Sequence, residues 1–172
     1  MGADGTVEGL SSPSATQLKR INSDPGHMEL VGAPEGFDAL ALAEIVRGRR
    51  GLSVFIARDT ARMSAFADSF AFFAPDVEVM RLPSWDCLPY DRIGPSPAVA
   101  AQRMTALARL AQGDFDAKRG ALLVAAVPAM IQKVPPREAV AAASYETRVG
   151  RPVAIADLER YFAVNGYQRA ST

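Results

Sequence analysis

The chain has 172 residues, 49% of them hydrophobic, which suits one globular domain or one domain joined to a fragment of another. Its 19 basic and 19 acidic residues cancel, so overall charge gives no attraction to nucleic acid or to an anionic membrane. One cysteine, Cys87, and one histidine, His27, exclude an internal disulfide and leave a metal site short of ligands, so we expect a cytoplasmic protein without a metal.

The N-terminal part of the chain changes character near residue 27. Residues 1–26 are rich in Gly, Ser, Pro and Thr, which is typical of a flexible leader or a tag. The short apolar run 28–31 then predicts a first strand. Apolar residues on nearly all sides of 37–47 predict a helix that is buried.

A strand and a helix follow this first pair. Residues 52–57 predict a central strand, and Asp59 or Thr60 can cap the helix after it. Apolar residues recur in this helix at helical spacing, and Pro75 ends it: Met63, Phe66, Ala67, Phe70 and Ala74.

Two more strands enclose a second helix. Residues 77–82 and 120–127 predict strands, the latter buried. Between them, Ser96 and Pro97 supply the cap and first-turn proline of a helix that Gly113 closes. Alternating strands and helices predict an α/β fold, a parallel sheet flanked by helices.

The pattern changes again near residue 137. An Ala-rich stretch precedes a predicted strand at 145–149, a helix at 155–165 and a strand that begins near Tyr167. We therefore divide the chain into a leader (1–26), an α/β domain (27–137) and the truncated start of a small α+β domain (138–172).

The turn between the first predicted strand and helix lies where a nucleotide-hydrolysing protein has its phosphate loop. Such a loop needs a Lys for the outer phosphates and a Ser or Thr for magnesium. Of its glycines only Gly32 is in register, with Gly36 displaced, and Asp38 and Ala39 stand at the Lys and hydroxyl positions. We predict no bound nucleotide, and on the loop alone an ordinary strand–helix turn is the alternative.

Residues 82–91 (Leu-Pro-Ser-Trp-Asp-Cys-Leu-Pro-Tyr-Asp), followed by Ser96-Pro97 and Arg103-Met-Thr-Ala-Leu, carry a resemblance to a known family. They resemble the N-terminal module of bacterial transcription-repair coupling factors (Mfd), with Asp86 for Glu and Met104 for Leu. Residues 120–132 and Gly166-Tyr167-x-Arg169 look like later parts of that module. The resemblance covers about 30–169 and implies a domain similar in fold to the repair helicase UvrB, with a degenerate phosphate loop.

The resemblance also implies a function. In that family the module is a non-catalytic scaffold that recruits UvrA to stalled RNA polymerase and holds the full-length protein autoinhibited, while motor domains elsewhere use ATP and bind DNA. We therefore expect UvrA, bound weakly by this chain, and the remaining domains of a full-length protein as partners, without direct DNA or membrane binding. The alternative is a fragment of a UvrB-like nucleotide- or DNA-binding repair helicase.

A basic group in the second unit is the candidate partner-binding surface: Arg148, Arg151, Arg160 and Arg169. The alternative is that they are ordinary solvated charges. Trp85 and Tyr90 are expected to pack against the sheet edge rather than to anchor a partner. Asp86 and Asp91 lack the companions that a catalytic carboxylate pair needs.

Overall fold

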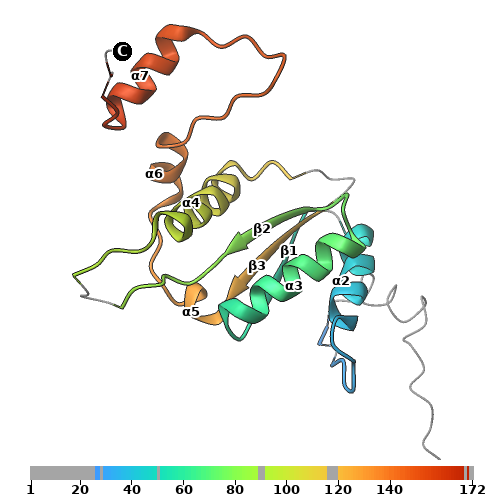
Figure 1. Cartoon of the computed structure of the whole chain (residues 1–172). Coiled ribbons are helices and arrows are strands. Elements are labelled where there is room, and N and C mark those ends of the chain that lie inside the picture. Colours follow the sequence, from blue (N-terminus) through green and yellow to red (C-terminus); the bar gives the residue numbers. More distant parts are fainter. Residues whose placement is uncertain are drawn as a thin grey trace, which may run out of the picture.

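A three-stranded parallel sheet forms the centre of the protein (Figure 1). The structure, a computed structural model, describes residues 26–27, 29–49, 51–88, 92–115, 120–168 and 170. Its elements follow in chain order: α2 (Phe37–Gly48), β1 (Leu52–Ala57), α3 (Thr60–Phe73), β2 (Glu78–Leu82), α4 (Pro97–Gln112), β3 (Ala121–Ala126), α5 (Val127–Met130), α6 (Arg137–Ala142) and α7 (Ile155–Val164). The predicted α/β class is confirmed.

The strand order is β1-β3-β2, so the central strand is β3. The expectation that residues 52–57 would be central was wrong. All six residues of β3 are buried, whereas β1 alternates and leaves Val54 48% and Ile56 51% exposed. A strand with a neighbour on each side and helices on both faces has no position that tolerates a polar side chain, and β3 contains none.

One face of the sheet is covered by α2 and α3. Phe66 and Phe70 of α3 are fully buried there, and the Phe66 ring stacks on Phe55 of β1 with 3.5 Å between centroids. Asp59 caps α3 as predicted, accepting a hydrogen bond from the backbone N–H of Arg62 at 2.7 Å. The expected all-round burial of α2 was wrong, because its side against α3 is covered while the other side is exposed, with Leu40, Glu44 and Arg47 on it.

The opposite face is covered by α4, which packs on β2 and β3. Ser96 and Gly113 bound this helix as predicted: the Ser96 hydroxyl accepts from the N–H of Val99, and Gly113 takes a left-handed conformation. The helix leaves the β1 half of this face open, so Leu52, Val54 and Ile56 lie exposed on it.

Three predicted strands do not appear among the described residues. Residues 29–31 are irregular, with Val31 77% exposed, and Met28 lies outside the described residues. Residues 145–149 and 167–168 are also irregular. In the part of the chain that the structure describes, none of these runs is paired with a strand, and a strand is stable only when paired.

The C-terminal part extends from α4. Helix α6 packs on α4, where Val140 is buried and Arg137 Nε donates to the carbonyl of Ala111 at 2.8 Å. Helix α7 lies beyond α6, away from the sheet, and none of its residues is buried (Figure 1). Among the described residues, no helix combines the length and apolar character needed to cross a membrane. The predicted domain boundary at 137 and 138 stays a prediction.

Candidate functional site

An ion pair joins the first turn of α2, directly after the predicted phosphate loop, to α3. Gly32 and Gly36 both have positive φ, and the helix begins directly afterwards at Phe37. Asp38 accepts from the N–H of Ala39 at 2.9 Å and pairs with Arg62 of α3. No strand precedes this loop in 29–31, so the described part of the chain lacks the strand–loop–helix order of a phosphate loop. At the predicted Lys position the structure thus places a carboxylate neutralised by a neighbouring helix.

Trp85 lies against a buried arginine of α4. The Arg103 guanidinium carbon is 4.3 Å from the Trp85 ring centroid, and Arg103 Nη1 donates to the carbonyl of Pro83 at 2.5 Å. The backbone N–H of Trp85 donates to Gln132 Oε1 at 3.4 Å. Trp85 therefore packs as predicted, but on Arg103 of α4, and no described contact places it on the sheet edge. Tyr90 lies outside the described residues.

Arg103 is fully buried, and its Nε and Nη2 atoms have no hydrogen-bond partner in the described structure. Burial lowers the pKa of this guanidinium. Of the two aspartates of the segment, Asp86 accepts from the N–H of Ser96 at 3.0 Å. The Ser96 side chain and, second, this backbone contact lower the pKa of the Asp86 carboxyl. Asp91 lies outside the described residues. Asp86 thus has a structural role at the start of α4.

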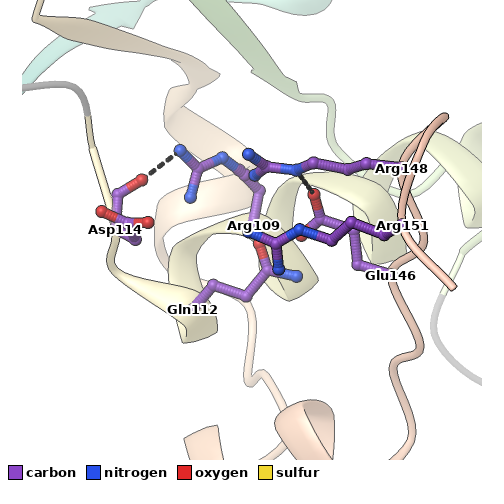
Figure 2. Close-up of a pocket in the computed structure, with 6 residues that line it drawn as sticks. All are labelled: Arg109, Gln112, Asp114, Glu146, Arg148 and Arg151. Carbon is purple, nitrogen blue, oxygen red and sulfur yellow. Dashed lines mark hydrogen bonds and ion pairs between the residues drawn. The ribbon is translucent and has the colours of Figure 1, made fainter.

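A pocket of about 290 Å³ lies between the end of α4 and the segment that follows α6 (Figure 2). Figure 2 shows the side chains of Arg148 and Arg151 extending toward α4, where Arg109 and Gln112 lie. Six residues line the pocket: Arg109, Gln112, Asp114, Glu146, Arg148 and Arg151. The pocket therefore joins two regions that are far apart in sequence.

Arg109 is held by groups of the α/β part of the chain. Its Nε and Nη2 donate to the two carboxylate oxygens of Glu78 on β2, at 2.6 and 3.0 Å. It also contacts the carbonyl of Asp114 and lies over the ring of Phe115, 4.8 Å from the centroid. Bidentate pairing of this kind fixes the guanidinium plane at the pocket wall.

Arg148 and Glu146 form the second pair in the pocket, with 2.7 Å between Nε and Oε1. The contact raises the pKa of Arg148 and lowers the pKa of Glu146, for which Gln112 and the charge of Arg109 add smaller contributions in the same direction. The two side chains thus stabilise each other's charged form.

The four predicted arginines do not form one cluster. Arg148 and Arg151 share the pocket, whereas Arg160 pairs with Asp157 on α7 at 2.5 Å, outside it. Arg169 lies outside the described residues. Arg109, Gln112 and Glu146 were missed, because nothing in their local sequence marks them and only the packing of 146–151 beside α4 brings them together.

The sequence predicts too few ligands for a metal site, and the structure can be searched for such a site only among the described residues. Among them no group of three or more His, Cys, Asp or Glu side chains is close enough to hold a metal ion. Cys87 is half-buried and His27 is exposed.

Comparison with known proteins places the chain beside one kind of protein, although no family model matches it. It is 32% identical over 149 residues to a transcription-repair-coupling factor of Myxococcus xanthus, a match that covers 82% of this chain and 12% of the relative. It is 29% identical over 121 residues to the transcription-repair-coupling factor of Haemophilus influenzae, covering 68% of this chain and 10% of the relative. The chain thus spans about a tenth of the length of the curated relatives it matches.

Proposed function

We propose that this chain, related to transcription-repair-coupling factors, is a UvrB-like module of such a factor, a non-catalytic scaffold that recruits UvrA to stalled RNA polymerase. The observation that carries the proposal is the similarity to two such factors over most of the chain. The packed Trp85–Arg103 pair supports it, since both residues belong to the motif that resembles the family.

The non-catalytic part of the proposal rests on the Asp38–Arg62 ion pair. A phosphate loop acts through a free cation and backbone N–H groups that face the phosphates. Here Asp38 would repel a polyphosphate, and Arg62, a cation close to it, is already paired with Asp38. Calorimetric titration with Mg-ATP should therefore give no affinity tighter than about 1 mM, and ATP should not raise the melting temperature. Tighter binding would favour the alternative of a nucleotide-binding repair helicase.

We also propose that the module packs against other domains of the full-length protein and thereby holds it autoinhibited. The exposed apolar residues of β1 and the uncovered face of α7 are surfaces that a further domain would bury: Leu52, Val54, Ile56, Ile155 and Val164. Such contacts would compete with UvrA for the module or hide the recruiting surface.

Recruitment is tested by biolayer interferometry with immobilised chain and purified UvrA. We expect weak, salt-sensitive binding that the double variant Arg148→Glu/Arg151→Glu reduces further. The matched control is Arg58→Glu, an exposed arginine at the end of β1 that is remote from the pocket-lining residues in sequence. Absence of any binding, or an equal loss in the control, would contradict recruitment through this surface.

A further inference from the structure

Two of the three arginines that line the pocket are held by a carboxylate. Arg109 is held by Glu78, and Arg148 is held by Glu146. The side chain of Arg151 has no hydrogen-bond or ion-pair partner among the described residues, although it lines the same pocket. Arg151 is therefore the pocket arginine whose guanidinium is available to a ligand.

A tight turn sets the direction of this cation. Gly150 has a φ of 87°, in the left-handed region that glycine favours, and the N–H of Arg151 donates to the carbonyl of Arg148 at 3.0 Å. The turn presents both arginine side chains toward the end of α4 (Figure 2). The Gln112 amide there bonds Glu146 and has a second N–H to donate. A planar acceptor between Arg151 and Gln112 could receive hydrogen bonds from both.

We propose that this pocket binds a carboxylate side chain from an acidic segment of a partner protein, with Arg151 as the principal ligand. The inference rests on the proposed recruiting function and specifies its chemistry. A volume of about 290 Å³ has room for one Asp or Glu side chain and some water. A guanidinium matches a carboxylate in shape and donates two parallel hydrogen bonds to it.

The same charges disfavour nucleic acid as the occupant. A phosphate backbone places a negative charge every few ångströms and is bound by several free cations. Here the three carboxyl groups of Glu78, Asp114 and Glu146 lie around the arginines and would repel such a chain. One unpaired cation among carboxylates suits a single carboxylate on a protein surface.

The test follows the arginine Nε–H resonances by NMR during titration with a short capped glutamate peptide. We expect the Arg151 signal to shift in fast exchange, with millimolar affinity, and the glutamine peptide of equal length to leave it unchanged. Inorganic phosphate and a short DNA duplex should bind more weakly than the glutamate peptide. Stronger binding of either one, or no shift at Arg151, would overturn the proposal.

Two substitutions with opposite expected signs separate binding from a structural effect. Arg151→Gln should lower the affinity for the glutamate peptide about two- to fivefold, the range expected for an exposed ion pair. Glu146→Gln removes the carboxylate that competes with the peptide and should raise the affinity for the peptide about twofold. Arg160→Gln is the matched control, since it removes one exposed arginine outside the pocket and should change nothing.

The peptide titration and the UvrA binding measurement test the two proposals separately. If Arg151 binds the peptide while UvrA does not bind the chain, the pocket chemistry stands and the recruiting function is wrong. If UvrA binds equally well to the chain and to its Arg151→Gln variant, recruitment stands and the pocket is not the contact.

Discussion

The α/β unit (β1–β3 with α2–α5) and the C-terminal segment (residues 144–168) have similar apolar patterns and very different packing. In the α/β unit Phe66, Phe70 and Leu122 are fully buried. In the C-terminal segment Val149 and Val164 are exposed, and α7 has no buried residue although its apolar residues share one face. A pattern of apolar residues thus specifies which face needs a partner, and a core forms only where the chain also provides that partner.

The largest expected difference in unfolding free energy is between truncation of a core residue in the α/β unit and truncation of an apolar residue in the C-terminal segment. Phe66→Ala should lower the free energy of unfolding by about 3–5 kcal/mol, because it leaves a cavity under Phe55 and Phe70. Val164→Ala should change it by less than about 0.5 kcal/mol, since the side chain is 80% exposed. Urea unfolding followed by circular dichroism measures both, and similar losses would mean that α7 is covered in solution.

Two glycines with positive φ give the next largest contrast. A Cβ on Gly120 would lie 2.9 Å from the carbonyl oxygen of Val46, whereas a Cβ on Gly150 would meet nothing within 4 Å. Gly120→Ala should therefore cost about 2–3 kcal/mol, from steric overlap added to backbone strain. Gly150→Ala should cost about 1 kcal/mol or less, because the exposed turn can relax. Equal costs in urea unfolding would show that the second turn is as constrained as the first.

Substitutions at the N-caps of α4 and α7 compare the two regions again, with a smaller expected change in unfolding free energy. Ser96→Ala should destabilise the protein by about 1 kcal/mol, because the hydroxyl accepts from the first turn of α4. Helix α7 starts at Ala154 without a side-chain cap, so Ala154→Ser should slow hydrogen exchange within α7 and leave global unfolding unchanged. A global gain from Ala154→Ser would mean that α7 unfolds together with the sheet.

The smallest effect concerns pH. The pKa of Glu146 is lowered, chiefly by Arg148, so the Glu146–Arg148 pair contributes fully above the ordinary glutamate pKa and is lost as pH falls through the lowered value. The Arg148 Nε–H resonance should shift as the pH falls below about 4.5. Glu146→Gln should abolish that shift. A shift that persists in this variant would assign it to another carboxylate, such as Asp114.

Local signals in the sequence predicted the α/β unit well. Asp59, Ser96 and Gly113 act through hydrogen bonds to residues three or four positions away, so the ends of α3 and α4 could be predicted from short windows. The order of the strands could not be predicted in this way. Residues 52–57 and 121–126 are both mainly apolar, and the order depends on pairing between segments that are far apart in sequence.

The candidate site divides in the same way. Arg148 and Arg151 could be named from the sequence as a basic group in the second unit, and the structure places both in one pocket. The structure also adds Arg109 and Gln112, which lie on the last turns of α4 and join the arginines only through tertiary packing. Which arginine is available depends on the carboxylates nearby, and sequence spacing carries no information about that.

The strand order also affects how the protein is synthesised. Of the three strands that the structure describes, only β3 has two neighbours, and it is the last to leave the ribosome. At a translation rate of about 5–20 residues per second, β3 is synthesised on the order of 10 s after β1. Throughout that interval Phe55 and Phe66 lack the central strand of the sheet that completes their core, so these rings stay accessible on the nascent chain until Ala126 emerges.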